Sequence, residues 1–292
     1  MAINEATGIA RQLADGSLND LNRAVYLNNL AASLSSHCQV TGDPAELVEA
    51  IEIGLQVAEM TPDGSKNRAI CLDGLGRSHY QKYCMTEMVS DLDEAIRCGW
   101  EAVNTMPLGD SRRAIARSNL SYGLLQRYCA TACVADLDES IRLGRQAVDE
   151  AGSGHRNREI VVRDRLASAL YERYTRMANL ENLEEAIRLE REAVDLTHQE
   201  YHQHHPRHLS NLALALSNRV NTTKSMAGAD EALQLGREAV NMTPSNHPDL
   251  PWHLCCLSLV LSIRFHETRQ PGDLAEAIHL GRRAVDLSPK NH

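Results

Sequence analysis

The chain has 292 residues, of which 43% are hydrophobic and 24% charged, and its formal net charge is −9. This balance is typical of a folded soluble protein, and the negative charge argues against a generic binder of nucleic acid or of anionic membranes, because both need basic patches. No apolar run reaches the roughly 20 residues of a membrane helix, and the first residues, "MAINEATG", lack the basic and apolar segments of a signal peptide.

The eight cysteines fit no disulfide framework for a chain of this length. Most of them lie within helical patterns, so we expect small buried hydrophobes in a reducing, cytoplasmic setting. Cys129 and Cys133 are four positions apart, but no second cysteine pair completes a zinc site around them.

Two kinds of helical segment alternate along the chain. The first kind, called helix A, has apolar residues every three to four positions around one recurring leucine. These leucines are Leu30, Leu75, Leu120, Leu166, Leu212 and Leu257. The second kind, called helix B, follows the form of "EAIRCGWEAVNTMP" at 94–107, and its copies begin at residues 49, 94, 139, 185, 231 and 276, which are 45 or 46 residues apart. A fixed period of this size predicts a stacked array of repeats.

No segment alternates with the two-residue period of a strand, so the whole chain is expected to be helical. The predicted fold class is all-α, an α-α superhelix of about six and a half helical hairpins in one solenoid domain spanning 1–292. The predicted boundaries are a half unit at 1–20 and repeats at 21–64, 65–109, 110–154, 155–200, 201–246 and 247–292.

The ends of helix B carry recognisable signals. Asp91, Asp136 and Asp273 each stand three residues before a glutamate and are expected to form capping boxes, with a weaker version at Asn182. In the first repeat Asp43 is expected to cap a helix that starts with Pro44. A proline then stops helix B in four repeats, at Pro62, Pro107, Pro244 and Pro289.

A glutamate opens every helix B, and a basic residue lies near the end of almost every helix A. We expect the two to pair within each hairpin, for example Glu139 with Arg127. The glutamates are Glu49, Glu94, Glu139, Glu185, Glu231 and Glu276, and the facing residues are His37, Lys82, Arg127, Arg173, Arg219 and Arg264. One carboxylate per repeat is too widely spaced for a shared catalytic role.

Helix B also carries a glycine in its middle, although such a glycine costs about 1 kcal/mol relative to alanine. The glycines are Gly54, Gly99, Gly144, Gly236 and Gly281. Each lies on a stripe of small residues, as with Ala95 and Ala102 around Gly99, and such a stripe allows another helix to approach closely. We therefore interpret the glycine as a packing residue. Glu190 takes its place in one repeat, where the groove should be wider or the side chain should reach solvent.

The small residues and terminal proline of helix B, together with the Leu-small pattern of helix A, resemble the tetratricopeptide repeat (TPR). The period here is longer than the typical 34 or so residues, and glycine stands where that repeat carries a bulky aromatic. The long unit resembles kinesin light chains and, more closely, fungal arrays, through "YLNNLAASLSSHCQVTGD" at 26–43, "TPSNHPDL" at 243–250 and "GDLAEAIHLGRRAVDLSP" at 272–289.

This resemblance implies a protein–protein interaction scaffold that binds a peptide or protein segment along helix A on its concave face. Residues around the recurring leucine are then the expected contacts, and an asparagine ladder is implied among them. They are Asn29, Asp73, Arg77, Tyr80, Asn119, Tyr122, Asp164, Arg165, Tyr171 and Asn211. Tyr122 and Tyr171 have a rival interpretation as core between repeats. Fungal arrays of this type also often adjoin a CHAT protease or a nucleotide-switch domain, and neither is visible here.

Enzymatic function is not indicated, because no phosphate-binding loop or strand-borne nucleophile motif occurs, and no cofactor is expected. An enzyme or small-molecule sensor with a pocket near Tyr80, Tyr122 and Tyr171 remains an alternative. A histidine cluster, His198, His202, His204, His205 and His208, offers imidazoles at metal-binding spacing. Because His205 and Pro206 align with an ordinary loop of the repeat at His247 and Pro248, we expect no metal there.

The ends of the array are expected to need partners. Residues 5–15, "EATGIARQLAD", resemble the second half of a helix B, and the last helix B shows apolar Ile278, Leu280 and Val285 with nothing after it to cover them. Solenoids normally have polar capping repeats. We expect either a segment of a larger protein or end-to-end self-association of two copies.

Overall fold

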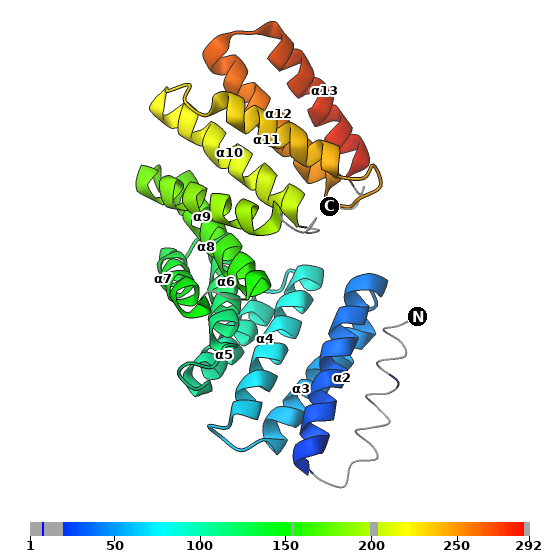
Figure 1. Cartoon of the computed structure of the whole chain (residues 1–292). Coiled ribbons are helices and arrows are strands. Elements are labelled where there is room, and N and C mark those ends of the chain that lie inside the picture. The colour runs from blue at the N-terminus through cyan, green and yellow to red at the C-terminus, as the bar shows by residue number, and fades with distance from the viewer. Residues whose placement is uncertain (1–7, 9–19, 153–154, 199–203, 289–292) are drawn as a thin grey trace. The chain divides into compact units, whose positions relative to one another are not determined.

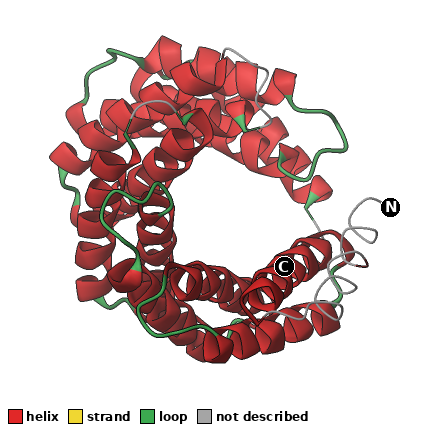
Figure 2. Ribbon diagram, turned by 60° about the horizontal axis from the view of Figure 1, so that its bottom comes forward, coloured by secondary structure: helices red, strands yellow, loops and turns green. Residues whose placement is uncertain are grey.

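The computed structural model describes residue 8 and residues 20–152, 155–198 and 204–288, and the regular secondary structure in these ranges is all α-helix (Figure 2). The helices are α2 (Asp20–Thr41), α3 (Pro44–Met60), α4 (Lys66–Thr86), α5 (Val89–Thr105), α6 (Arg113–Thr131), α7 (Val134–Ala151), α8 (Arg156–Met177), α9 (Leu180–His198), α10 (His205–Thr223), α11 (Ala229–Met242), α12 (Leu250–Thr268) and α13 (Pro271–Leu287). The predicted half unit at 1–20 lies almost wholly outside the described residues. None of the described helices is long and apolar enough to cross a membrane.

The chain divides into two compact units, Met1–Gly152 and Ser153–His292. The first contains the hairpins α2/α3, α4/α5 and α6/α7, and the second contains α8/α9, α10/α11 and α12/α13 (Figure 1). Within each unit the two helices of a hairpin pack together, and each helix B packs on the following helix A. The prediction of about six all-α hairpins is confirmed, whereas a single continuous solenoid stays a prediction.

The glycine of helix B lies against the recurring leucine of the next helix A. A Cβ placed on Gly99 would come within 3.1 Å of Leu120 Cδ1, and one placed on Gly54 within 3.1 Å of Leu75 Cδ1. In the second unit, a Cβ on Gly236 would meet Leu257 Cδ1 at the same distance. These contacts are tighter than an ordinary side chain accepts, so the packing interpretation is confirmed at these junctions and explains why the helix tolerates the propensity cost.

In three hairpins the basic residue of helix A pairs with an aspartate and not with the predicted glutamate. Arg127 donates two hydrogen bonds of 2.8 Å to Asp136, and Lys82 donates one of 2.8 Å to Asp91. Arg264 pairs in the same way with Asp273 at 3.3 Å. The aspartate faces helix A because it lies on the inner side of the first turn of helix B, one turn before the glutamate.

Two of the glutamates that were expected to make these pairs have other partners. Glu139 pairs with Arg142 on its own helix, at i, i+3. Glu276 pairs with Arg237 of the preceding helix B at 2.7 Å. These pairs lie on the outer, solvent-facing layer of helix B, where each contributes little to stability.

The capping-box prediction is also wrong for the same aspartates. Helix α5 begins at Val89 with Met88 as N-cap, so Asp91 lies inside the first turn and its carboxylate is used by Lys82. The cap of α3 is confirmed, because Asp43 accepts a hydrogen bond of 2.9 Å from the Ala45 amide and Pro44 is the first helical residue. The described stop signals are confirmed as well, since α3, α5 and α11 end just before Pro62, Pro107 and Pro244; Pro289 lies outside the described residues.

Two expectations about buried side chains are only partly met. Four of the eight cysteines are buried, while Cys84, Cys129, Cys133 and Cys255 are exposed, and all eight are free thiols. On α13, Ile278 and Val285 are exposed, at 47% and 74%, as expected. Leu280 is not: it is buried in the core of the second unit, because it points inward between these two outward positions.

Candidate functional site

In the first unit, two neighbouring A helices bring together four of the residues predicted to bind peptide. Asn119 on α6 donates a 2.7 Å hydrogen bond to Asp73 on α4. Further along the same two helices, the rings of Tyr80 and Tyr122 meet edge to face, 5.3 Å apart, with their hydroxyl oxygens 3.4 Å apart. These side chains are partly exposed and form a polar and aromatic row across the two helices.

The other two predicted residues of this unit lie at its margins. Arg77 is exposed and its guanidinium is 4.0 Å from the carboxylate of Asp73. Asn29 is exposed on α2 and lines a shallow pocket of about 340 Å³ with residues of α3 and α4. The asparagine ladder stays a prediction, and within it the Asn119 amide donates one hydrogen bond to Asp73.

The second unit contains a larger pocket, of about 440 Å³, between α8, α9, α10 and the start of α12. Tyr171 and Asn211, both predicted contacts, line it. Its remaining lining residues are Ala167, Ser168, Ala186, Glu190, Arg207, Leu214, Ala215, Asp249 and Trp252. This volume is within the range of small-ligand sites, and the mixture of aromatic, apolar and charged walls is typical of them.

Glu190 occupies the glycine position of α9 and lies at the wall of this pocket. Its side chain does not reach solvent, since Glu190 is only 4% exposed. The pocket beside Glu190 agrees instead with the expectation of a wider groove at this repeat. Glu190 Oε2 lies 3.1 Å from His208 Nδ1, and Oε1 accepts a 3.2 Å hydrogen bond from the Asn211 amide.

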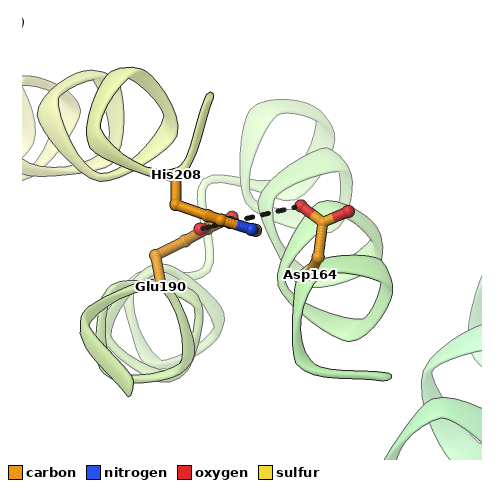
Figure 3. Close-up of side chains that lie close together, drawn as sticks. All are labelled: Asp164, Glu190 and His208. Carbon is orange, nitrogen blue, oxygen red and sulfur yellow. Dashed lines mark hydrogen bonds and ion pairs between the residues drawn. The ribbon is translucent and has the colours of Figure 1, made fainter. Parts of the chain in front are cut away.

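A third titratable group completes a cluster with these two. Asp164 Oδ1 on α8 lies 3.8 Å from His208 Nδ1 on α10. Figure 3 shows the three side chains of Asp164, Glu190 and His208 converging from three different helices, with the imidazole directed toward both carboxylates. Each helix contributes one residue, so the cluster exists only when the hairpin α8/α9 packs on α10.

Burial and charge shift the pKa values of this cluster. Burial raises the pKa of Glu190, which His208 partly offsets and Asp164 reinforces. Burial by itself would lower the pKa of His208, but the two carboxylates outweigh it and raise that pKa overall. Nearby, burial raises the pKa of Tyr171 to about 12, and its hydroxyl accepts a 2.8 Å hydrogen bond from Asn218. Arg165 is partly buried on α8.

The predicted histidine cluster is not assembled among its described members. The His205 imidazole is bonded to Thr197 at 2.7 Å, His204 is exposed just before α10, and His208 faces Glu190 and Asp164. His202 and the side chain of His198 lie outside what the structure describes. His205 and His208 both point into the protein from α10, but they contact different partners and do not share one site.

Three residues at or beside this pocket were not predicted as site residues from their place in the repeat. Glu190 was recognised only as an exception to the glycine pattern, and His208 only as part of a local histidine run. Trp252 was passed over, although it is one of two tryptophans in the chain and is 50% exposed at the pocket. A signal was available for Glu190, because a charged residue replaced glycine at a position facing another helix.

Solved structures with a similar fold identify the type of helical repeat. No family model and no curated protein matches the chain. A Podospora anserina protein described as a kinesin light chain with nearly identical TPR-like repeats matches it with a TM-score of 0.52 and 17% identity, over 76% of this chain and 96% of that one. A chain of the APC/C hetero-tetramer Cut9–Hcn1 matches with a TM-score of 0.59 and 13% identity, over 97% of this chain and 46% of that one. Together with the hairpins described above, these matches show that the chain has the tetratricopeptide-repeat fold.

Proposed function

We propose that the chain is a protein-interaction scaffold that binds a peptide or protein segment along its A helices. The observation that carries the proposal is the pocket of about 440 Å³ on the A helices of the second unit, with the half-exposed Trp252 at its wall. Exposed aromatic side chains beside a pocket are the usual anchors of protein interfaces. The row formed by Asp73, Asn119, Tyr80 and Tyr122 supplies a second set of polar and aromatic contacts in the first unit.

The chemistry of both regions suits an extended segment with polar backbone and one or two anchoring side chains. Asp73 and Asn119 provide carboxylate and amide groups, which hydrogen-bond a backbone without reading its sequence. Tyr171 and Trp252 provide apolar area for an inserted side chain. The net charge of −9 favours partners with basic segments. A cytoplasmic location fits the free thiols.

Trp252 allows a direct test. A Trp100→Phe variant leaves Trp252 as the one tryptophan, so its fluorescence reports on the pocket. Peptides selected from a random phage-displayed library on the immobilised chain should quench or shift this emission saturably. Trp252→Ala should weaken their binding by roughly 30-fold, the effect of losing about 2 kcal/mol at a hot spot.

Leu55→Ala is the matched control, because Leu55 is 44% exposed on α3 and lies outside the pocket. It should leave the affinity unchanged. Failure to select any peptide, or equal affinities for Trp252→Ala and the parent chain, would refute peptide binding at this pocket.

The same pocket supports a second candidate, a small-molecule sensor or enzyme, because its volume is that of a small-ligand site and charged groups line it. Thermal-shift screening of a metabolite library separates the two, since a small ligand should stabilise the chain and compete with the selected peptides. A regulatory role beside a CHAT-type protease or a nucleotide-switch domain is a further form of the scaffold proposal, and sequencing the surrounding gene tests it.

The exposed apolar residues of α13 support end-to-end self-association of two copies. Ile278 and Val285 are 47% and 74% exposed on the outer side of this helix. Sedimentation equilibrium should show a dimer that Val285→Glu dissociates. A parent chain that stays monomeric at high concentration contradicts this part of the proposal.

A further inference from the structure

The cluster of Asp164, Glu190 and His208 has the composition of a metal site that the histidine pattern did not predict. Each residue offers one ligand atom, and these atoms all lie within 4.8 Å of one another. The three groups come from α8, α9 and α10 and converge on one point (Figure 3). One imidazole and two carboxylates form a ligand set that Zn²⁺ and similar divalent ions accept.

The separations between these atoms match those within one coordination sphere. His208 Nδ1 is 3.1 Å from Glu190 Oε2 and 3.8 Å from Asp164 Oδ1. Ligands at about 2.0 to 2.1 Å from a tetrahedral zinc ion are separated by roughly 3.3 Å, which lies between these two distances. Since all three ligand atoms lie within 4.8 Å of one another, adjustment of the side chains alone can bring them around one ion.

An unpaired polar atom is a second and independent sign of a ligand. Asp164 Oδ1 is buried and has no hydrogen-bond partner among the described residues. A buried carboxylate oxygen without a donor loses its hydration without compensation, which is costly. A cation bound between Asp164 and His208 supplies the missing partner.

Glu190 is also held as a ligand would be. Its Oε1 accepts a hydrogen bond from the Asn211 amide, and this contact directs Oε2 toward the other two groups. Such outer hydrogen bonds are typical of metal-binding carboxylates. Glu190 also lines the pocket of about 440 Å³, so the cluster adjoins this space through one of its three ligands.

The repeat pattern indicates that the cluster is specific to this junction. At the first junction, Gly54 and Cys71 occupy the positions equivalent to Glu190 and His208, and the Cys71 thiol donates to the Gly54 carbonyl at 3.2 Å. The two ligands therefore replace a glycine and a small apolar residue that already face each other. Burying the Glu190 carboxylate at the α9/α10 junction has a desolvation cost, which a bound cation offsets.

We propose that Asp164 Oδ1, Glu190 Oε2 and His208 Nδ1 bind one divalent transition-metal ion of the Zn²⁺ class, with its remaining position open to the pocket. The ion balances the charge of the two carboxylates, and the neutral imidazole binds it through Nδ1. This site adjoins the pocket that Trp252 lines, but it uses other residues and goes beyond the proposed scaffold function.

Titration of the EDTA-treated chain with Zn²⁺ and with Co²⁺ tests the proposal. Calorimetry should show one saturable Zn²⁺ site, and Co²⁺ should give the visible absorption bands of a site with four or five ligands. Glu190→Gln and His208→Gln should each weaken Zn²⁺ binding by about 100-fold or more. His266→Gln should not change it, because His266 is exposed at the other end of the second unit's helices.

Glu190→Gly serves as a second variant that is expected to fold, because glycine occupies this position in the other repeats. Its circular dichroism spectrum should match that of the parent chain. Absence of a saturable site in the parent, or Zn²⁺ binding that Glu190→Gln and Glu190→Gly leave intact, would overturn the proposal. Peptide binding is measured with EDTA present, so its failure is distinguishable from failure of the metal site.

Discussion

The junctions α5/α6 in the first unit and α9/α10 in the second use the same repeat position in opposite ways. At α5/α6 the absence of a side chain on Gly99 lets Leu120 lie against the helix backbone. At α9/α10 the same position carries Glu190, which is buried and bonded to His208 and Asn211. A side chain at this position of helix B is therefore accommodated where the facing helix supplies polar partners and a pocket lies between the helices.

The largest effect is expected from moving the second junction's residue into the first. Gly99→Glu should destabilise the chain by about 3 to 5 kcal/mol, because the carboxylate is buried against Leu120 without a partner. Chemical denaturation followed by circular dichroism measures the loss. A variant as stable as the parent would mean that the α5/α6 junction accepts a buried carboxylate without polar partners, which contradicts the proposed difference between the two junctions.

A somewhat smaller effect is expected from removing one partner at the second junction. In the presence of EDTA, His208→Cys should cost about 3 kcal/mol, because Glu190 is left buried without its imidazole. The double variant Glu190→Gly/His208→Cys recreates the pair seen at Gly54 and Cys71 and should recover most of this loss. Additive effects in the double-mutant cycle would show that the two side chains do not interact.

The hairpin ion pair is expected to contribute less than either junction. Arg127→Ala and Asp136→Ala should show a coupling of about 1 kcal/mol, because the bidentate contact is partly buried. Arg127→Ala and Glu139→Ala should be additive, since Glu139 pairs with Arg142. The second unit offers a comparison, because Asn182 replaces the equivalent aspartate of its first hairpin.

The smallest effect is a dependence on pH that both units should share. Burial lowers the pKa of His79 in the first unit and of His253 in the second. Because each folded-state pKa is below the ordinary value of about 6.5, the unfolded chain takes up protons first and stability falls as the pH drops below that value.

Unfolding free energies at pH 7.5 and 5.5 measure this dependence. His79→Gln should reduce the acid-induced loss by less than about 1 kcal/mol, and His253→Gln by a similar amount. A loss that is unchanged in the double variant would assign the pH dependence to other groups.

Much of the fold could be predicted from the sequence because its signals are local and repeated. The six hairpins, the cap at Asp43 and the packing role of glycines such as Gly99 each follow from spacing along one helix or from recurrence in several. The pairing of Arg127 could not be predicted with the same success, since Asp136 and Glu139 are one turn apart and differ only in which side of the helix they face. The row of Asp73, Asn119, Tyr80 and Tyr122 was anticipated as a set, but its internal contacts were not.

By itself the sequence determined the repeat, its helical character and the one position, Glu190, where the repeat is broken. A periodic pattern suffices for this, because helix formation and glycine packing depend on neighbours at known spacings. Only the tertiary structure decided that Glu190 meets His208 and Asp164. The three residues lie on three different helices, and Asp164 and His208 are nearly one repeat apart in the sequence. The physical reason is that a buried charge takes whichever partners the packed helices bring within about 4 Å, and that geometry is set by the stacking of hairpins and not by the order of residues.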